Sequence, residues 1–573
     1  MINKWNFQTP SEEELHKRDQ LVAELGFSPV ICLLLVQRGI TSIEEAKKFF
    51  KPSLNDLHDP FLMPDMDKAV RRLNKALGNK EKILIYGDYD VDGTTAVSLV
   101  FKYLRPYSST LDFYIPDRYD EGYGISYKGI DYAAENGVSL VISLDCGIKA
   151  IEKIEYAKEK GIDFIICDHH MPDATLPDAV AVLDAKRSDS IYPYEHLSGC
   201  GVGFKFMQAF AKSNNFPFSD LEKLLELTAV SIASDIVPIT GENRILAYYG
   251  LKQLNSNPSL GLKGIIDICG LTGKEITISD IVFKIGPRIN ASGRMMNGKE
   301  AVELLLSKDS ASAREKSESI NQYNEERREL DKKITDEANA VIDEVENMDD
   351  RKAIVVYNPG WHKGVIGIVA SRLTEKYYRP AVVLTKSSEL ITGSARSVTG
   401  DIYKAIESCR DLLENFGGHT YAAGLSLREE NLEAFTERFL KIASEEIIPE
   451  QMIPQIDIDA ILDLKEINQK FVNDLKKMSP FGPDNQKPVF CSLGVKDYGT
   501  SKLVGKELEH LKLELIDGNS STPMHAIAFG MHRYNDHIKG MKPFNICYTV
   551  EENTYNGNTS IQLMIKDIKP DDI

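Results

Sequence analysis

Acidic and histidine side chains follow short apolar runs at four places in this 573-residue chain, and this pattern constrains the fold more than any other feature. The first three runs, residues 83–85, 140–142 and 164–166, have the length and composition of buried strands, and helix-like segments separate them. Such alternation is typical of an α/β fold with a doubly wound parallel sheet. The polar residues that follow the runs are Asp88, Asp90, Asp92, Asp145, Asp168, His169, His170 and Asp235.

In such a sheet the carboxyl ends of neighbouring strands lie along one edge, so these side chains are expected to converge there. Carboxylates packed so densely would repel one another unless a cation compensated their charge. Oxygen and imidazole ligands together suit Mn²⁺ or Mg²⁺ better than a metal that prefers thiolates. The sequence therefore predicts a site for divalent cations at this edge of the sheet.

Each cluster also has an ordinary structural explanation when it is taken alone. Residues 88–93 begin like an EF-hand loop, but Leu99 stands at the twelfth position, where calcium requires a bidentate glutamate, so calcium is excluded. The segment is otherwise compatible with an acidic turn, Asp145 with a helix cap, and the two histidines with packing groups. Three strand ends that bring such groups to one edge favour the metal site over these separate explanations.

The rest of the chain divides into regions of different composition. Residues 1–80 are predicted to be helical, 81–308 to form the domain with the acidic clusters, and 309–350 to form one long charged helix between two domains. A second α/β unit is expected over 351–450. Short strand-like runs separated by turns over 454–573 predict a small β-barrel such as an OB-fold.

The net charge of −18 would by itself argue against a protein that binds nucleic acid. Two stretches are nevertheless basic: 284–294 contains three Lys or Arg residues and no acid, and 361–379 contains four against one glutamate. This division of charge fits a protein that holds a polyanion in a groove.

The sequence also bears on the cellular compartment. No apolar stretch approaches the roughly 20 residues needed to span a bilayer, and the first residues lack the apolar core of a signal peptide. The eight cysteines include no CxxC pair. We therefore expect a protein of the reducing cytoplasm that is not bound to membranes.

Three segments are candidates for binding phosphate. A helix that begins near Gly93 would present free backbone N–H groups to phosphate oxygens. Residues 417–419 offer amides and an imidazole to an anion, although a plain turn is the simpler explanation of this tripeptide. Ser394 and Arg396 either clamp a phosphate, which arginine binds in bidentate fashion, or lie on a surface strand with an ordinary ion pair.

Taken together, these segments resemble the motifs of the DHH phosphoesterase family. YGDYDVDG, SLDCG, DHH and SDIVP, in this order, are similar to its first four motifs. IGPRINASGRM, GWHKGVIGIVASRL, GSARS and FGGH are similar to further motifs, of which the first two are typical of the branch that contains single-stranded-DNA exonucleases. The resemblance covers nearly the whole chain from Lys82 to Ile573 and implies a DHH domain, a DHHA1 domain and a C-terminal OB-fold.

The resemblance also implies roles for individual residues. Two Mn²⁺ or Mg²⁺ ions would be held by Asp88, Asp90, Asp92, Asp145, His169 and Asp235, with Asp145 as the bridge between them. His170 would contact the scissile phosphate, and Asp168 would orient the imidazoles. Candidate contacts to the substrate are Arg118, Tyr119, Tyr123, Arg288, Arg294, Trp361, His362, Ser394, Arg396, Gly417, Gly418 and His419. The basic groups among them would neutralise phosphate, the aromatic rings would stack on bases, and Ser394 and Arg396 would hold a 5′ end.

The implied activity is hydrolysis of single-stranded DNA in the 5′ to 3′ direction, with release of 5′-mononucleotides, in DNA repair and recombination. Two metal ions would activate water and steady the attacking and leaving oxygens. Expected partners are single-stranded DNA, a helicase and a single-strand-binding protein, and the chain is expected to be a monomer. Two alternatives stay open: a phosphodiesterase for pyrophosphate, short oligonucleotides or cyclic dinucleotides, and a scaffold that binds DNA or replication proteins without turnover.

Overall fold

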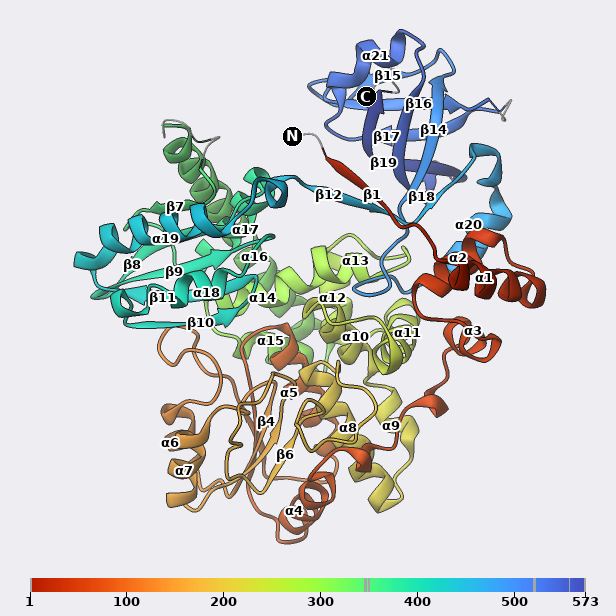
Figure 1. The fold of residues 1–573 in the computed structure, drawn as a ribbon. Helices are drawn as coiled ribbons and strands as arrows, with labels where there is room; N and C mark the ends of the chain where they lie inside the picture. The colour runs from red at the N-terminus through yellow and green to blue at the C-terminus, as the bar shows by residue number, and fades with distance from the viewer. Residues whose placement is uncertain (1–2, 345–347, 349–350, 519–521, 556, 571–573) are drawn as a thin grey trace. The chain divides into compact units, whose positions relative to one another are not determined.

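The computed structural model describes residues 3–344, 348, 351–518, 522–555 and 557–570 (Figure 1). The chain forms two compact units. The larger unit is Leu57–Ile453, and the smaller one combines Met1–Asp56 with Pro454–Ile573. The predicted long helix was expected to reach residue 350, but residues 345–347 and 349–350 lie outside the described part of the chain.

A five-stranded parallel sheet with the order β3-β2-β4-β5-β6 carries the acidic clusters. Its strands are β2 (Ile83–Gly87), β3 (Leu111–Tyr114), β4 (Leu140–Leu144), β5 (Asp163–Cys167) and β6 (Ala181–Leu183). Strands β2 and β4 are buried along their whole length, as expected of apolar strands that helices cover on both faces. The predicted α/β architecture with a parallel sheet is confirmed.

The register of the sheet brings the acidic clusters level with one another. Gly87 pairs with Leu144, which in turn pairs with Cys167. The residues that follow these three, Asp88, Asp145 and Asp168, therefore leave the sheet side by side at its carboxyl edge.

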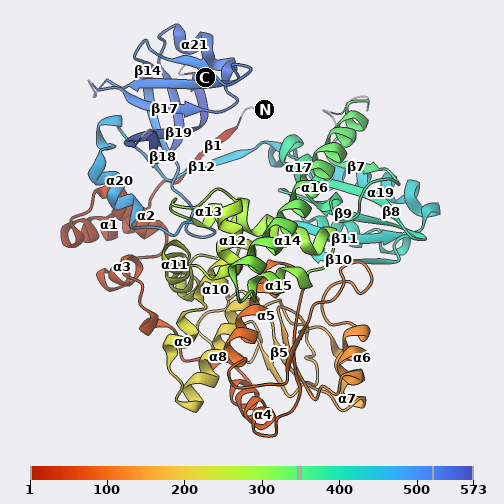
Figure 2. The same ribbon diagram turned by 180° about the vertical axis from the view of Figure 1, so that it is seen from behind.

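Helices cover both faces of this sheet (Figures 1 and 2). Helices α6 (Tyr127–Glu135) and α7 (Ile151–Glu159) share one apolar core with β2, β4, β5 and β6, while α5 (Val91–Leu104) and α8 (Gly199–Asn214) pack on the other face. Further helices of this region are α4 (Met66–Gly78), α9 (Phe218–Glu222), α10 (Leu225–Ser234), α11 (Gly241–Ser256), α12 (Leu260–Ile268), α13 (Ile278–Asp280), α14 (Gly286–Met295) and α15 (Lys299–Leu305), with a short helical turn η2 (Pro60–Leu62) and a π-helical turn η3 (Ile281–Ile285). The helical turn η1 (Leu54–Asp56) belongs to the smaller unit.

One 34-residue helix, α16 (Ser310–Asp343), connects the two α/β parts of the larger unit. Asp309 caps its first turn by accepting the N–H of Ser312, and the helix contains neither Gly nor Pro. It packs on α12, α14 and α15 with its first half and on α17 (Ile366–Tyr377) with its second. The helix thus bridges the two parts, as its charged and uninterrupted sequence predicted.

The second α/β part is a five-stranded sheet with the order β10-β11-β9-β8-β7. Its strands are β7 (Ile354–Tyr357), β8 (Ala381–Ser387), β9 (Leu390–Arg396), β10 (Asn415–His419) and β11 (Ala422–Leu427). Only the β7–β8 pair is parallel. Helices α16 and α17 cover one face, and α18 (Ile402–Glu407) and α19 (Leu432–Glu446) cover the other; short helical turns are η5 (Arg410–Leu412), η6 (Glu429–Asn431) and η7 (Pro449–Met452).

The smaller unit contains a small β-barrel. Its sheet order is β13-β14-β18-β19-β17-β16-β15, and β14 also pairs with β16, which closes the sheet on itself. The strands are β13 (Ala460–Ile461), β14 (Phe490–Asp497), β15 (Lys502–Val504), β16 (His510–Ile516), β17 (Met524–Ala528), β18 (Phe544–Tyr555) and β19 (Asn558–Pro570), and the helical segments are η8 (Leu464–Glu466), α20 (Gln469–Lys476), η9 (His532–Tyr534) and α21 (Asn535–Lys539).

The N-terminal residues share their core with this barrel. Strand β1 (Lys4–Phe7) pairs in parallel with β12 (Gln455–Ile458), far along the chain. Helices α1 (Glu12–Leu25), α2 (Pro29–Gln37) and α3 (Ile43–Phe50) bury apolar side chains in one core with α20 and the barrel strands. The helices expected in 1–80 are present, whereas the boundaries drawn at 80, 308, 350 and 450 stay predictions.

None of the helices in the described part of the chain is long and apolar enough to cross a membrane.

One ion pair joins α16 to α17 beside their apolar core, and it gives a test of the fold. Arg372 donates from Nε and Nη2 to the two carboxylate oxygens of Asp331, at 2.8 and 2.6 Å, and the Asp331 side chain is only 1% exposed. Arg372→Met removes the hydrogen-bonded partner of this buried charge and should lower the free energy of unfolding by about 2 kcal/mol. Scanning calorimetry of the full chain measures the effect. Lys376→Met, which removes an exposed bond to Asn339 and a contact with the Tyr377 ring, is the control, and equal stability of both variants would contradict the prediction.

Candidate functional site

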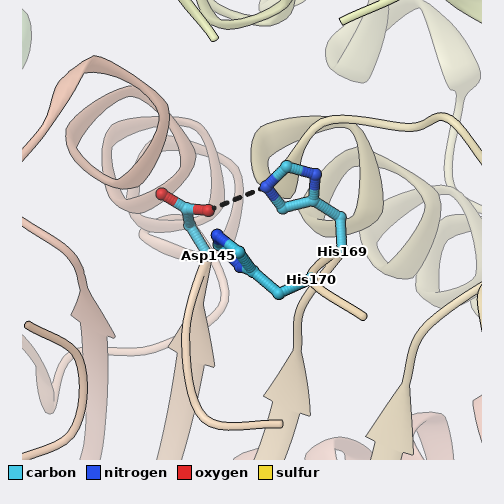
Figure 3. Close-up of side chains that lie close together, drawn as sticks. All are labelled: Asp145, His169 and His170. Atoms are coloured by element: carbon cyan, nitrogen blue, oxygen red, sulfur yellow. Dashed lines mark ion pairs between the residues drawn. The ribbon is translucent and has the colours of Figure 1, made fainter. Parts of the chain in front are cut away.

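His169 lies at the centre of the acidic cluster. Its Nε2 atom is 3.2 Å from Asp145 Oδ1 and 3.6 Å from both Asp92 Oδ2 and Asp235 Oδ2. Figure 3 shows Asp145 and the two histidines extending from neighbouring strand ends, with Asp145 facing His169. The carboxyl edge of the sheet therefore gathers groups from β4 and β5, with Asp92 on α5 and Asp235 at the end of α10.

Three overlapping groups in the described residues have a spacing suitable for a metal ion, because their ligand atoms lie within 4.8 Å of one another. The groups are Asp88, Asp90 and Asp145; Asp92, His169 and Asp235; and Asp145, His169 and His170. All six residues predicted as ligands belong to these groups, and Asp145 belongs to two of them. Two neighbouring ions with Asp145 between them are compatible with this arrangement.

The donor set fits a divalent cation. Both ring nitrogens of His169 are buried without a hydrogen-bond partner. Burial lowers the pKa of His169 to about 4, although the charge of Asp92 opposes this shift, so its imidazole is neutral at physiological pH. A neutral imidazole among carboxylate oxygens is the ligand combination suited to Mn²⁺ or Mg²⁺.

Burial and mutual repulsion raise the pKa values of several carboxylates in the cluster. Burial, followed by repulsion from neighbouring aspartates, raises the pKa values of Asp88, Asp90 and Asp145. The same two causes, burial and then the charge of Asp92, raise the pKa of Asp235 to about 8. A bound cation would compensate these charges, whereas protons compensate them when no cation is bound.

Asp168 and His170 form a separate pair beside the cluster. Asp168 Oδ1 lies 2.7 Å from His170 Nδ1 and also accepts the backbone N–H of His169 at 2.8 Å. Burial acts to raise the pKa of Asp168, but the hydrogen bond and charge of His170 lower it to about 2. Burial likewise opposes protonation of His170, but the bond to Asp168 raises the pKa of His170 to about 9. The pair therefore keeps a protonated imidazole beside the metal ligands at neutral pH.

Close backbone packing explains two glycines around the site. A Cβ atom at Gly93 would lie 2.3 Å from the carbonyl oxygen of Asp88, and one at Gly199 would lie 2.6 Å from Asp145 Cβ. Helices α5 and α8 can therefore begin directly against the residues that follow β2 and β4 only because these positions lack a side chain.

Backbone donors of α8 hold Asp92 in place. Its carboxylate accepts the N–H groups of Gly199 at 2.6 Å and Cys200 at 2.7 Å, and the hydroxyl of Ser231 at 2.7 Å. Asp90 Oδ1 accepts the N–H of Gly93 at 3.0 Å and caps α5. These bonds fix the orientation of both carboxylates before any ligand binds.

Arginine side chains from both α/β parts of the larger unit gather near Arg294. Burial, followed by the positive charges of Arg118, Arg327 and Arg396, lowers the pKa of Arg294 to about 10. Within the described residues none of these four arginines forms a salt bridge. Mutually repelling guanidinium groups that form no salt bridge in this part of the structure make a site suited to a phosphate group.

Two arginines of this cluster donate hydrogen bonds to backbone carbonyl oxygens. Arg294 Nη1 donates to the carbonyl oxygen of Gly364 at 3.0 Å, and Arg396 Nη1 donates to that of Ala395 at 2.8 Å. Ser394 and Arg396 both lie next to Gly367. A Cβ atom built at Gly367 would be 3.3 Å from Ser394 Oγ and 3.2 Å from Arg396 Nη2, so these two predicted phosphate ligands are close together. The geometry thus brings Arg118, Arg294, Ser394 and Arg396 together.

Tyr123 stands at the metal cluster, as the predicted role requires. Its hydroxyl donates to the carbonyl oxygen of Asp145 at 3.0 Å and lies 3.2 Å from His170 Nε2. The residue is 51% exposed. Its ring is therefore accessible to a substrate beside the candidate ligands.

The structure contradicts the stacking role expected of Trp361. Its side chain belongs to the core formed with α16 and α17, and its indole N–H donates to Glu337 at 2.8 Å. Tyr119 is also engaged, because its hydroxyl donates to the carbonyl oxygen of Arg294 and Lys363 Nζ lies 4.3 Å from its ring centroid. Tyr123 is consequently the best placed of the three predicted rings.

Of the other predicted substrate contacts, Arg288 and His362 form hydrogen bonds within the protein, and His419 is exposed. Arg288 donates to Asn321 of α16 at 2.9 Å and so braces that helix, while His362 Nδ1 accepts the N–H of Gly364 at 3.1 Å. His419 is exposed, and burial followed by the positive charges of His170 and nearby lysines lowers its pKa. The effect of His170 on this pKa reflects the proximity of the segment 417–419 to the histidine pair.

Sequence reasoning missed three polar groups. Asp184 follows β6 in register with the other strand ends, is fully buried, has one oxygen without a partner, and has its pKa raised to about 7 by burial. Lys186 Nζ donates to the carbonyl oxygen of His169 at 2.5 Å. Arg327 joins the arginine cluster from α16. The run AVLD carried the same signal as the other strands, whereas nothing local in sequence marked Lys186 or Arg327.

The residue after Asp235 adopts a strained backbone conformation. Helix α10 ends with Asp235 as its C-cap, and Ile236 follows in the left-handed region with φ of +58°. For a β-branched residue this conformation costs about 1–3 kcal/mol. Ile236 is also 63% exposed, so burial of its side chain does not offset this cost.

Comparisons with known proteins agree with this geometry. Residues 82–232 match the family described as "DHH family, N-terminal domain", residues 350–445 match "DHHA1 domain", and residues 458–567 match "RecJ OB domain". A curated protein of Bacillus subtilis named single-stranded-DNA-specific exonuclease RecJ is 37% identical over 98% of this chain and 70% of its own length. The chain belongs to the RecJ family.

Further RecJ relatives match over most of their length. The RecJ exonuclease of Haemophilus influenzae is 32% identical, over 95% of this chain and 96% of that protein. A crystal structure of RecJ in complex with Mn²⁺ from Thermus thermophilus superimposes with a TM-score of 0.85 and 25% identity, covering 99% of this chain and 79% of that one. The domain composition implied by the sequence motifs is confirmed by these matches.

The raised pKa values at the site predict how pH affects the stability of the metal-free protein. A group whose pKa is raised on folding stabilises the fold at low pH, and this stability is lost as pH rises through the folded pKa. Asp235, with a pKa of about 8, and His170, with a pKa of about 9, both act in this direction. In EDTA the Tm should therefore fall as pH rises from about 6.5 to about 8.

Mn²⁺ should reverse this loss, because the cation replaces the protons that compensate the carboxylates. The increase in Tm on adding Mn²⁺ should be larger at about pH 8 than at about pH 6.5, as scanning fluorimetry would measure. Asp235→Asn is the control, since it removes one repelling charge and should weaken both effects. A metal-free Tm that rises with pH across this interval would contradict the electrostatic account.

Proposed function

We propose that this protein is an exonuclease that hydrolyses single-stranded DNA in the 5′ to 3′ direction and releases 5′-mononucleotides. The single observation that carries the proposal is the presence, in one compact unit, of a buried carboxylate and imidazole cluster and a group of arginines without salt-bridge partners in the described residues. The first arrangement suits divalent cations and the second suits a terminal phosphate. Membership of the RecJ family, whose relatives are named single-stranded-DNA-specific exonucleases, supports the same activity.

We propose that two Mn²⁺ or Mg²⁺ ions bind to Asp88, Asp90, Asp92, Asp145, His169 and Asp235. The bound ions would activate water and neutralise charge on the attacking and leaving oxygens. The hydrogen bonds to Asp92 and Asp90 keep those carboxylates oriented, and the neutral imidazole of His169 offers Nε2 to a cation. These residues would therefore form a charged binding site, with ligands of fixed orientation, for the catalytic ions.

His170 is proposed to act on the scissile phosphate. Asp168 accepts a hydrogen bond from Nδ1 and keeps the ring protonated, since it raises the pKa of His170 to about 9. The N–H at Nε2 lies 3.2 Å from the Tyr123 hydroxyl, and we propose that it donates to a phosphate oxygen when substrate is bound. A cationic donor of fixed orientation stabilises the negative charge that develops on phosphorus-bound oxygens.

Direction of cutting is proposed to come from the arginine cluster. Arg118, Arg294 and Arg396, with Ser394, would bind a 5′-terminal phosphate, and Arg327 adds a fourth positive charge from α16. Binding of the end would position the first phosphodiester bond at the metal cluster. Arg288, His362 and the segment 417–419 are proposed as further contacts to the strand.

The remaining parts of the chain are assigned by the same proposal. Residues 81–308 would perform the chemistry, 351–450 would bind the strand end, and 454–573 would add affinity for the strand beyond the site. We propose that the protein acts as a cytoplasmic monomer with a helicase and a single-strand-binding protein, in DNA repair and recombination. Size-exclusion chromatography with light scattering, and pull-down assays with purified partners, test these assignments.

Digestion of long single-stranded DNA labelled at either end tests the activity itself. With Mn²⁺ or Mg²⁺ we expect mononucleotides to be released first from the 5′ label, and EDTA should abolish the reaction. Blunt duplex DNA should be spared. Rapid cleavage of dinucleotides without turnover of long strands would instead favour the small-substrate phosphodiesterase, and no turnover of either would favour a scaffold.

Replacement of the proposed bridging ligand tests the metal centre. Asp145→Asn preserves the volume of the side chain but removes the charge shared by two of the metal-binding groups. It should lower kcat by about 1,000-fold or more and leave the circular-dichroism spectrum unchanged. Activity within a few-fold of the wild-type value would contradict the assignment of Asp145.

Replacement of one arginine tests the strand-end site. Arg396→Ala should reduce the preference for a 5′-phosphate over a 5′-hydroxyl end by about tenfold, because a bond between two charged groups is lost. The ratio of kcat/KM for the two substrates measures this preference. Arg428→Ala, which removes only an exposed ion pair with Glu414, is the matched control. An unchanged ratio in Arg396→Ala would remove Arg396 from the site.

A further inference from the structure

Ile236 occupies a position where glycine is the least strained residue. Helix α10 ends at Ser234, Asp235 forms the C-cap, and Ile236 is the next residue, with φ of +58° and Pro238 two residues further on. Left-handed geometry at this position is a common way to end a helix, but it is usually adopted by Gly or Asn. A branched Cβ is the least favourable side chain for it.

Packing in the protein does not explain this choice of residue. Ile236 is 63% exposed, so most of its side chain contacts solvent instead of the core. Both the strained backbone and the exposed apolar surface are therefore unfavourable in the unbound protein. A ligand that covered the side chain would offset the second cost.

The location of Ile236 indicates what this ligand is. Its neighbour Asp235 places Oδ2 3.6 Å from His169 Nε2, so the residue borders the metal cluster. Two other exposed side chains belong to residues near this cluster: Met171 follows His170 in the chain and is 60% exposed, and Tyr123 contacts His170 and is 51% exposed. Exposed apolar surface thus lies next to groups suited to cations and phosphate.

A nucleotide at the scissile bond presents a charged phosphate and, one sugar away, an uncharged flat base. The metal cluster suits the first, and an exposed aliphatic surface suits the second, because covering the side chain with the apolar face of a base removes apolar surface from water. We propose that Ile236 is a further substrate-binding residue that contacts the base of the nucleotide being released. This inference rests on the proposed exonuclease function and identifies a substrate contact that the metal ligands and arginines do not provide.

Removal of the side chain at Ile236 separates this contact from the fold. The substrates are two 5′-phosphorylated single strands that differ only in their first residue, a normal nucleotide or an abasic one. The wild-type protein should favour the normal strand by about fivefold in kcat/KM. Ile236→Gly should lower this ratio at least twofold, without a decrease in Tm, since glycine relieves the left-handed strain. Ile236→Val, which keeps an apolar branched side chain, should retain the ratio.

Lys80→Gly is the matched control. Lys80 also follows the C-cap of a helix, α4, in the left-handed region with φ of +58°, and it precedes β2 at the opposite end of the sheet from the metal cluster. This variant should relieve the same kind of strain and preserve the wild-type ratio. A base-to-abasic ratio that is the same in Ile236→Gly and the wild-type protein would overturn the proposal.

Two other outcomes are equally decisive. A lower Tm in Ile236→Gly, with equal loss of activity on both strands, would show that Ile236 supports the end of α10 instead of contacting a base, and would also overturn the proposal. If the wild-type protein cleaves neither strand, the exonuclease function fails, and the ratio is then measured from binding of the two strands by fluorescence anisotropy. A binding ratio that falls in Ile236→Gly supports the base contact, and an unchanged one refutes it.

Discussion

Electrostatic repulsion among buried aspartates is the constraint on which the rest of the site depends. Strand and helix ends bring carboxylates within a few ångströms of His169, and burial together with mutual repulsion raises the pKa of Asp88, Asp145 and Asp235. Such a cluster persists only if the surrounding fold holds it and a cation or protons compensate it. The fold provides the first condition through the strand register and the close packing of α5 and α8.

The two α/β parts of the larger unit contribute different groups to the candidate site. The parallel sheet supplies ligands for cations, while the second sheet and α16 supply Arg396 and Arg327 to the arginine cluster. Helix α16 makes this possible because it packs on α14 at one end and on α17 at the other. A phosphate group held by the arginines would therefore be presented to the metal cluster by a continuous, rigid element.

Burial decided which predicted residues remain available to a substrate. Tyr123 and Trp361 look equivalent in sequence, as aromatic residues within conspicuous motifs. The structure leaves Tyr123 exposed beside His170 but places Trp361 in the core under α16, bonded to Glu337. Conversely, Asp184, Lys186 and Arg327 were not predicted as site residues, but they lie among them in the structure. Long-range packing, which no local pattern encodes, made both distinctions.

Local sequence by itself determined the strands, the acidic clusters that follow them and the long helix, because hydrophobic periodicity and strand-end position depend on near neighbours only. It also determined that Asp88, Asp145 and Asp168 lie together, since parallel strands align their carboxyl ends. Only the tertiary structure decided that Met1–Asp56 shares a core with Pro454–Ile573, and that α10 ends in a strained Ile236 beside Asp235. These features depend on contacts between segments far apart in the chain and on backbone geometry that many sequences can adopt.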